Sequence, residues 1–275
     1  MTSSRSAAHR YEYVATGLFG LLHVACLAGF FYPPTLKLLL LAALTYSVRM
    51  FAITAGYHRY FSHRSYKMGR AAQFCMAFLA QTSAQKGVLW WAAQHRQHHR
   101  HSDDEHDVHS PLLQGFWWSH AGWILSEKHE GYEPKQIADF ARFGELRWLD
   151  RYHWVPTVVF AAVILAPGGP RAFLWGYVIS TVVLYHCTFA INSLAHLFGT
   201  RRFDTADGSR NNWLLALVTF GEGWHNNHHF NMSSCRQGYR WWEIDITWTI
   251  LRLLSLVGVT RDLRPFRIPA RGAEK

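Results

Sequence analysis

Residues 14–31 read VATGLFGLLHVACLAGFF, eighteen positions without a formal charge. A Tyr-Pro-Pro turn follows at 32–34, and residues 35–55 are again strongly apolar, with Lys37 and Arg49 near the ends of that run. A helix needs about 20 apolar residues to cross the hydrocarbon core of a bilayer. This stretch therefore predicts a transmembrane hairpin with spans at 14–31 and 35–55.

A second pair of apolar runs lies at 152–167 and 172–192, around a Pro-Gly-Gly-Pro turn. Four spans in two hairpins leave 56–151 and 196–260 outside the bilayer, where we expect a helical cap. The sequence shows no internal repeat and no long linker, so we expect an all-α integral membrane protein in which 1–275 is one domain.

Positive charge is distributed unevenly along the chain. The sequence has 28 Lys and Arg against 18 Asp and Glu, a formal net charge of +10, and the two turns between the spans carry only Lys37 and Arg171. Positively charged loops remain on the cytoplasmic side of membranes, so we expect the cap and both termini in the cytoplasm, at a bacterial inner membrane. The charge is also typical of contact with anionic lipid, or of docking by an acidic redox protein or anionic carrier. No nucleic-acid-binding motif is present.

Eighteen histidines are many for so apolar a chain, and eight fall into three boxes: HxxxxH at His58–His63, and HxxHH at both His95–His99 and His225–His229. Helix positions i, i+3 and i+4 share a face, so each HxxHH box is expected to direct up to three imidazoles toward one point. An i, i+5 pair diverges on a regular helix, so His58 and His63 are expected to straddle a helix end. Imidazole suits Zn, Cu, Fe and Ni, and eight ligands exceed one tetrahedral zinc. The boxes predict two metal ions without selecting the element.

These motifs resemble the integral-membrane fatty acyl desaturases, particularly the Δ9 acyl-CoA (stearoyl-CoA) branch and its bacterial-type members. The matching segments, in the family's order and spacing, are Gly56–Lys67, His95–His99, Asn192–Gly199 and Gly221–His229. The resemblance implies a non-haem di-iron centre that uses O2 to introduce a cis double bond, by expectation at Δ9, into a saturated acyl chain. The implied iron ligands are His58, His63, His95, His98, His99, His196, His225, His228 and His229. Asn192 is implied to approach the second iron through water.

Other site residues are expected near the boxes and on the second span. Carboxylates close to the boxes could orient imidazole N–H groups; they are Asp103, Asp104, Asp107 and Glu222. In the family, the acyl tunnel runs from the metals between the spans. Three residues lie one turn apart on one face of the second span, namely Ala42, Tyr46 and Met50, and we expect Tyr46 to limit the accepted chain length.

The sequence departs from the animal acyl-CoA enzymes where those enzymes contact CoA. Glu127-Lys128 stands in place of their Arg-Lys pair. The acyl carrier therefore stays open between CoA, acyl carrier protein and intact lipid, and Lys86 and Lys128 are the candidates for contact with its phosphate. Neither a haem-binding His-Pro-Gly-Gly segment nor a nucleotide-binding glycine motif is found. Electrons are therefore expected from a separate ferredoxin or cytochrome b5 with its reductase.

Two alternatives remain open. The same metal centre could hydroxylate the acyl chain or act as an acetylenase, and the boxes do not distinguish these outcomes from desaturation. A non-catalytic membrane protein that binds metal for transport or sensing would place ionisable ligands inside the spans. Apart from His153 at the edge of the third span, only His23 and His186 lie there, which disfavours that second alternative.

Overall fold

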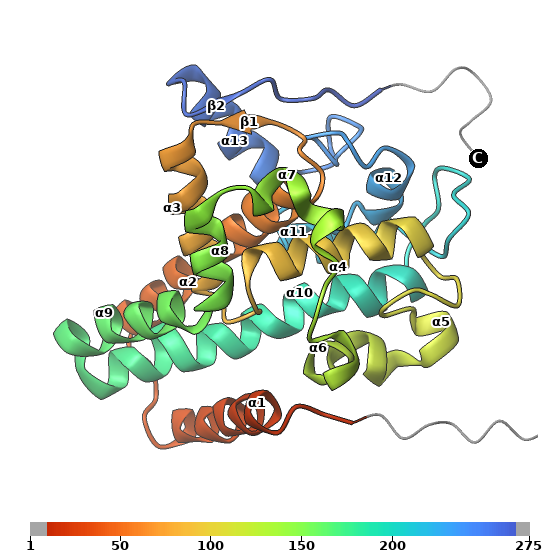
Figure 1. Cartoon of the computed structure of the whole chain (residues 1–275). Coiled ribbons are helices and arrows are strands. Elements are labelled where there is room, and N and C mark those ends of the chain that lie inside the picture. Colours follow the sequence, from red (N-terminus) through yellow and green to blue (C-terminus); the bar gives the residue numbers. More distant parts are fainter. Residues whose placement is uncertain (1–9, 268–275) are drawn as a thin grey trace, which may run out of the picture.

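The computed structural model describes residues 10–267. Within them, three helical stretches are long and apolar enough to cross a membrane (Figure 1). In order, they comprise α1 (Tyr13–Cys26) with the 3-10 turn η1 (Leu27–Phe30); α2 (Leu36–Phe51) with the π-helix η2 (Ala52–Ser62); and α9 (Trp154–Phe173), the π-helix η6 (Leu174–Ile179) and α10 (Ser180–Leu197). The first begins and ends within one residue of the predicted span.

The third stretch is broken inside the Pro-Gly-Gly-Pro segment. Gly169 has φ 68° and ψ −173°, a conformation that is strained for any residue with a Cβ atom, and Pro167 and Pro170 flank it. Figure 1 shows α9 and α10 running alongside each other on the two sides of this kink, and α9 packs against η6. The break therefore lies where the sequence predicts a turn between two spans.

The second helix continues past residue 55, where the sequence analysis ends its second span. It runs to Ser62 as η2, whose residues are all buried. Gly56 permits this, because a Cβ atom there would lie 2.8 Å from Cγ of Met76 on α3 (Arg70–Gln81). The close approach of α3 encloses the end of this helix in protein. The chain therefore stays helical into the cap, where His58 and His63 lie.

A buried arginine, Arg49, joins α2 to α10. Arg49 is fully buried and donates to the carbonyl oxygen of Thr45, to Oγ1 of Thr181 at 2.6 Å and to Oγ of Ser180 at 2.6 Å. A buried charge is costly unless its donors are paired. These three acceptors compensate the charge and fix α2 against α10.

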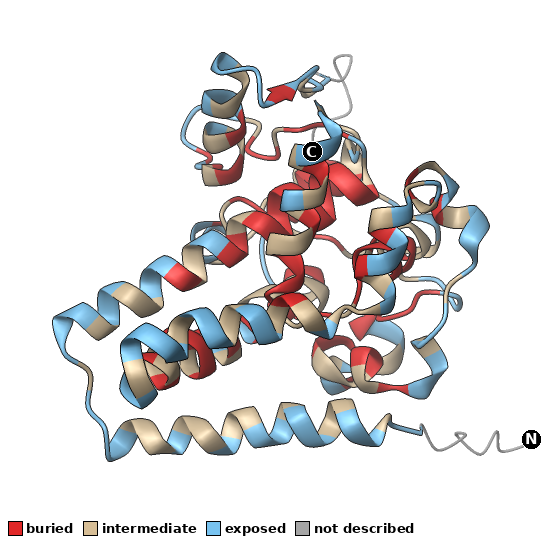
Figure 2. Ribbon diagram, turned by 60° about the vertical axis from the view of Figure 1, so that its left-hand side comes forward, coloured by how far each residue is buried: buried red, intermediate tan, exposed pale blue. Residues whose placement is uncertain are grey.

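Short helices form the cap around the end of η2. Besides α3 they are α4 (Val88–His101), α5 (Pro111–Gln114), η3 (Trp118–Gly122), α6 (Trp123–Leu125), η4 (Glu127–His129), η5 (Pro134–Ile137), α7 (Ala138–Ala141), α8 (Gly144–Arg151), α11 (Trp213–Val218), α12 (His225–Phe230) and α13 (Ile246–Leu256). Strands β1 (Lys67–Met68) and β2 (Thr260–Arg261) pair antiparallel. Figure 2 shows buried residues concentrated where these elements converge, while the outward faces of the long helices are exposed. The core thus lies in the cap, and the exposed apolar faces are suited to lipid.

Candidate metal centre

The nine histidines of the predicted ligand set come together at the junction of η2, α4, α10 and α12. They form two groups, and in each the candidate ligand atoms lie within 4.8 Å of one another. The five-histidine cluster contains His58, His63, His95, His99 and His228. The four-histidine cluster contains His98, His196, His225 and His229.

Each HxxHH box is divided between the two clusters, which corrects the expectation that a box points at a single centre. On α4, His95 and His99 belong to the five-histidine cluster and His98 to the other. On α12 the division is reversed, because His228 joins the five-histidine cluster. The reason is helical geometry: at about 100° per residue, side chains at i+3 and i+4 fall on opposite sides of the side chain at i. One box can therefore supply two neighbouring metals.

The HxxxxH box is brought together by the π-helix. The backbone N–H of His63 donates to the carbonyl oxygen of His58 at 3.2 Å, the i to i+5 bond that defines π geometry. The two rings consequently stand one turn apart, with their centroids separated by 4.8 Å. His63 lies just past the helix end, as the sequence analysis expects, but the π-helix itself is not predicted.

Helix ends near the boxes are held by buried polar groups. The carboxylate of Asp150 on α8 accepts the N–H groups of Leu89 and Trp90 in the first turn of α4, at 2.8 and 3.0 Å. Gly87 allows this approach, because a Cβ atom there would lie 2.2 Å from the same carboxylate. These contacts fix the rotation of α4, and with it the direction of its three histidines.

The two asparagines inside the third box anchor α12. Oδ1 of Asn226 accepts the backbone N–H groups of Arg202 and Phe203, both at 2.8 Å. The side chain of Asn227 donates to the carbonyl oxygen of Gln237 at 3.0 Å. Asn226 and Asn227 lie between His225 and His228 on this six-residue helix, so the side of α12 that carries them binds the surrounding protein.

Distances between ring nitrogens fit metal coordination. Facing Nε2 atoms lie 3.0 Å apart in His58–His228, 2.9 Å in His63–His95, 2.9 Å in His99–His228 and 3.0 Å in His196–His225. Two imidazoles bound at right angles to one metal, with bonds of about 2.0–2.1 Å, would place their nitrogens about 3 Å apart. In the four-histidine cluster, Nε2 of His98 and of His229 is buried and has no hydrogen-bond partner among the described residues. The donor set therefore suits two metal ions.

Carboxylates hold most rings of the four-histidine cluster through Nδ1. The pairs are His98–Asp107 at 2.9 Å, His196–Asp103 at 2.8 Å and His229–Asp207 at 2.7 Å. In the five-histidine cluster, Nδ1 of His58 contacts Glu222. A carboxylate that accepts the Nδ1–H leaves Nε2 with a free lone pair for a metal. Three of the four expected carboxylates thus contact ligand histidines, whereas Asp104 contacts His101 at 3.0 Å, outside both clusters.

Charge at the site agrees with this assignment. Burial would raise the pKa of Asp103, but the hydrogen bond and charge of His196 outweigh it and lower that pKa to about 2. Burial, followed by repulsion from neighbouring rings, lowers the pKa values of His95 and His99 well below the usual range. The carboxylates are therefore charged and these rings neutral near pH 7, the forms that bind a metal cation.

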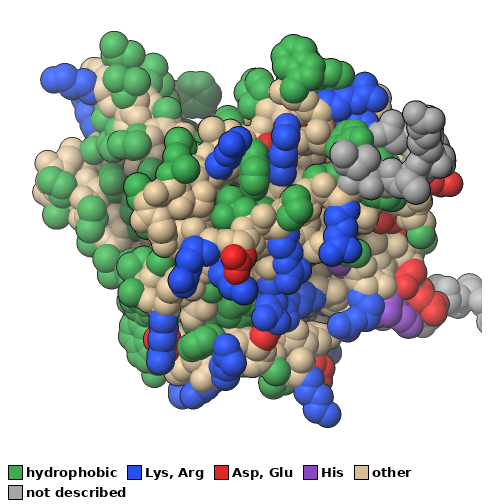
Figure 3. All heavy atoms as spheres, turned by 90° about the horizontal axis from the view of Figure 1, so that it is seen from above, with side chains coloured by type: hydrophobic (Ala, Val, Ile, Leu, Met, Phe, Trp, Pro, Cys, Tyr) green, Lys and Arg blue, Asp and Glu red, His purple; other side chains and the backbone are tan. Residues whose placement is uncertain are grey.

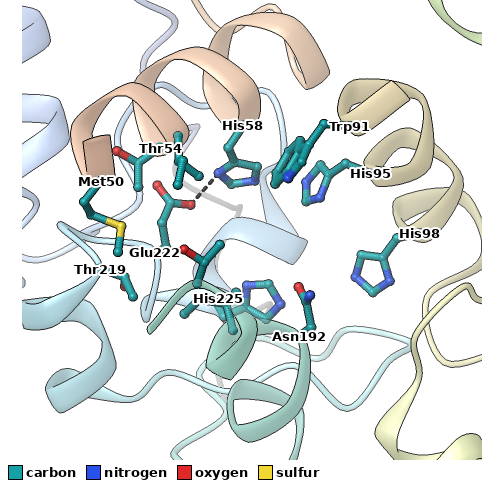
Figure 4. Close-up of a pocket in the computed structure, with 13 residues that line it drawn as sticks. Met50, Thr54, His58, Trp91, His95, His98, Asn192, Thr219, Glu222 and His225 are labelled. Atoms are coloured by element: carbon teal, nitrogen blue, oxygen red, sulfur yellow. Dashed lines mark ion pairs between the residues drawn. The ribbon is translucent and has the colours of Figure 1, made fainter. Parts of the chain in front are cut away.

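A largely apolar cavity of about 470 Å³ opens between the clusters and the spans. Met50, Ile53 and Thr54 line it from the second helix, and Thr188 and Ile191 line it from α10. Figure 4 shows rings from both clusters around it, with Asn192 between His225 and His98. A smaller cavity of about 340 Å³ shares Trp91, His95, Thr188 and Asn192 with the first and adds Gln85, Trp123 and Phe189. The two cavities therefore adjoin each other beside the histidines, and we call them together the slot.

Comparison with known proteins identifies the family. A sequence model of fatty acid desaturases matches residues 34–255. The chain belongs to the fatty acid desaturase family. Its relatives include the sn-2 palmitoyl-lipid 9-desaturase of Nostoc sp. (strain 36), 35% identical over 94% of this chain and 92% of the relative. The acyl-CoA 5-desaturase AL21 of Anemone leveillei is 35% identical over 90% and 78%. The sn-1 stearoyl-lipid 9-desaturase of Anabaena variabilis is 37% identical over 77% and 78%.

The predicted substrate residues of this desaturase lie at different distances from the slot. Met50 lines it, and Tyr46 packs against the apolar cluster containing Met50, with its hydroxyl donating to the carbonyl oxygen of Val218 at 2.5 Å. Ala42, one turn further along α2, does not line the slot. Lys86 is half-buried in the loop before α4, and Lys128 is exposed in η4. Neither lysine lines the two cavities.

Other contacts of the folded desaturase are not predicted by the sequence analysis. Asp207 lies in the loop between α10 and α11, with no short spacing to a box. His109 is buried and stacks on His98 with ring centroids 4.2 Å apart. A chain of rings joins Nε2 of His23 to Nε2 of His186 at 2.9 Å, and Nδ1 of His186 to Nε2 of His120 at 2.9 Å. Only the folded chain brings these groups together.

Proposed function

We propose that this desaturase introduces a cis double bond, at Δ9, into a saturated long-chain acyl group, using O2, a di-iron centre and external electrons. The observation that carries the proposal is one juxtaposition: two clusters of imidazoles border a largely apolar slot between the spans. The 9-desaturases among the relatives support the position of the double bond, and a 5-desaturase relative makes that position a matter for experiment.

Two iron ions held by the nine histidines would supply the oxygen-activating chemistry that side chains lack. The residues of the chain contribute position and exclusion. Asp103, Asp107 and Asp207 hold three rings with Nε2 directed inward. Asn192 offers a polar group between the rings of the four-histidine cluster (Figure 4). The apolar walls of the slot exclude water and hold one methylene pair beside the metals, so that a single bond of the chain is oxidised.

The membrane arrangement belongs to the proposal. We place four spans in two hairpins across a bacterial inner membrane, with the cap and both termini in the cytoplasm. The kink at Gly169 and the antiparallel course of α9 and α10 support the second hairpin. Single cysteines introduced at Pro33 and Gly168 should react with an impermeant maleimide from the periplasm, whereas one at Lys135 should react only in inverted vesicles. Labelling of all three positions from one side would contradict the arrangement.

Lipid profiling tests the reaction. The protein, expressed in a host that lacks desaturases, should produce a new monounsaturated acid in gas chromatography–mass spectrometry, and His98→Ala should abolish it. His106→Ala, which removes an exposed ring outside both clusters, is the control and should retain the product. A hydroxylated or acetylenic product would replace the proposal with the corresponding alternative. Metal analysis that finds a single zinc, without any oxygen-dependent product, would support a non-catalytic metal protein.

The end of the slot is proposed to set chain length. Met50 lines the slot and Tyr46 packs behind it, with Ala42 one turn beyond. Tyr46→Ala should shift the accepted chain toward longer acids, measured as the product distribution. Leu44→Ala, on an exposed position of the same helix, should not. An unchanged distribution in Tyr46→Ala would contradict this role.

The carrier and the electron source complete the proposal. The relatives act on acyl-lipids or acyl-CoA, and acyl carrier protein is a third candidate. Lys86 and Lys128 are proposed to contact the anionic head of the carrier. Lys86→Glu with Lys128→Glu should raise KM for the carrier that is used and leave KM for a short, uncharged acyl ester unchanged. Electrons are proposed to come from a ferredoxin or cytochrome b5 with its reductase.

A further inference from the structure

A second hollow, of about 1370 Å³, lies on the surface of the cap between α3, α7 and the β1–β2 pair. Figure 3 shows Lys and Arg side chains gathered across this face of the molecule. We call it the basic cleft, and its cations are Arg64, Lys67, Arg70, Arg142, Arg261 and Arg264. Nothing in the proposed function uses it.

Only half of these cations are neutralised. Arg64 pairs with Asp139 at 3.5 Å, Lys67 with Asp262 at 2.8 Å and Arg70 with Glu145 at 2.7 Å. The other three, Arg142, Arg261 and Arg264, are exposed and make no ion pair with an acidic side chain within residues 10–267. The cleft therefore carries a net positive charge and suits an anionic partner.

The wall of the cleft adjoins the five-histidine cluster through short bonded paths. Arg64 follows His63 directly and turns away from the helix with φ 51°. Arg96, the neighbour of His95 on α4, donates to both oxygens of Asp139 at 2.9 Å, and Asp139 lines the cleft. Two ligand histidines are thus one residue away from groups in or bound to this surface.

The acyl slot has a different lining. None of the residues that line the basic cleft lines either cavity of the slot. An acyl chain held in the slot therefore has no shared wall through which its anionic head would reach these arginines. The basic cleft consequently fits a partner that must approach the metals without entering the slot.

We propose that the basic cleft is the docking surface for an acidic, soluble one-electron carrier protein. This inference rests on the proposed function, since desaturation consumes two external electrons and two protons per double bond, with O2 leaving as two waters. Each docking delivers one electron and leaves the carrier oxidised by one electron. Complementary charge would increase the rate of encounter and orient the carrier toward the five-histidine cluster.

A binding experiment tests the surface independently of catalysis. The protein in phosphatidylcholine nanodiscs, which carry no net lipid charge, is titrated with fluorescently labelled plant-type [2Fe–2S] ferredoxin and, separately, with the soluble domain of cytochrome b5. The cleft variant combines Arg142→Glu, Arg261→Glu and Arg264→Glu. The control applies the same charge change to three exposed cap arginines outside the cleft, as Arg151→Glu, Arg240→Glu and Arg252→Glu.

For the carrier that binds the wild type, Kd should be about tenfold higher or more in the cleft variant at low ionic strength. The Kd of the variant should also depend less on salt concentration than that of the wild type. The control should stay close to wild type. Equal Kd values for the two variants, or failure of both carriers to bind the wild type, would overturn the proposal. So would a cleft variant that binds the carrier normally but loses affinity for vesicles containing anionic phosphatidylglycerol, because the cleft would then be a lipid site.

Turnover separates this proposal from the proposed function. With the carrier as donor, the cleft variant should make product more slowly, and with dithionite it should match the wild type. If the wild type makes no double bond with any reductant, the proposed function fails while the binding result still stands. A cleft variant that is equally slow with both donors, or that shows a raised KM for the acyl substrate and a normal Kd for the carrier, would contradict docking.

Discussion

The two histidine clusters of the candidate metal centre are built on different principles. The five-histidine cluster has more ligands than its neighbour, but Glu222 is the one carboxylate found on an Nδ1 atom among its described rings. The four-histidine cluster has one ligand fewer, and carboxylates hold three of its rings. Metal binding by the five-histidine cluster should therefore depend on the number of its imidazoles. Metal binding by the four-histidine cluster should depend on the orientation of each imidazole.

The largest expected effect comes from removing a ligand from each cluster. His196→Ala leaves three imidazoles in the smaller cluster, and we expect it to lose about one metal per chain. His63→Ala leaves four, so it should retain more metal. In both variants, the amount of product should fall further than it does when a carboxylate that orients a ligand histidine is lost, a change that costs about 10–100-fold. Metal analysis by mass spectrometry measures the difference, and equal retention would break the comparison.

The carboxylates give the next largest effect. Asp103→Asn keeps the size of the side chain but weakens its hold on the His196 ring, so metal affinity or activity should fall by about 10–100-fold. Asp104→Asn is the matched control, because that neighbouring carboxylate contacts His101 rather than a ligand. A metal titration with competing chelator measures both variants. Similar losses in the two would show that charge near the cap matters more than orientation of the ring.

Asn192 tests the role of a polar group between the four-histidine cluster and the slot. It lies beside His98 and His225 of the smaller cluster, where its amide can position a water. Asn192→Ala should lower turnover by about fivefold, the equivalent of one hydrogen bond of about 1 kcal/mol. Metal content should change little, and Asn192→Asp, which keeps an oxygen, should retain more activity. Loss of a whole metal in Asn192→Ala would show that this residue is a direct ligand.

The smallest effect concerns acid stability of the metal-free protein. Burial lowers the pKa of His95 in the folded protein. The unfolded chain therefore binds a proton near pH 6.5 that the folded chain does not bind, and the free energy of unfolding falls as the pH falls. Burial opposes protonation of His98 too, but Asp107 outweighs it and raises that pKa, so His98 adds stability on the acid side that is lost as pH rises. Thermal unfolding between pH 7.5 and 5.5 should therefore decline less steeply in His95→Asn and more steeply in His98→Asn, by a few °C. If the melting temperatures of the two variants changed with pH in parallel, the opposite pKa shifts of His95 and His98 would be contradicted.

The residues near the boxes are predictable from sequence because their chemistry is local. Spacing identifies the eight box histidines, and the resemblance to the desaturase family adds Asn192 and His196. Asp103, Asp107 and Glu222 lie close enough to a box to be suspected. Asp207 does not, since its contact with His229 depends on the course of the loop after α10.

Helix geometry accounts for the other differences. The division of His95, His98 and His99 between the two clusters depends on the rotation of α4 relative to the other helices. Asp150 and Gly87 fix this rotation from outside the box. The π-helix η2 passes close under α3 at Gly56, where a side chain would meet Met76. Local spacing contains neither contact. The long apolar runs, in contrast, locate three long apolar helical stretches, because the thickness of a bilayer sets a minimum length for each. The second of these stretches continues to Ser62, past the end predicted at residue 55.

The dispersal of the ligands along the chain has a consequence for biogenesis. Four members of the five-histidine cluster, from His58 to His99, leave the ribosome well before the third box. The four-histidine cluster has only His98 until α10 is made, and it gains His225 and His229 only when the third box is made. A nascent chain can therefore bring most of one cluster together during membrane insertion, whereas the other must wait for the third box. Chains truncated before residue 225 would leave the translocon with a partial first site and no usable second one.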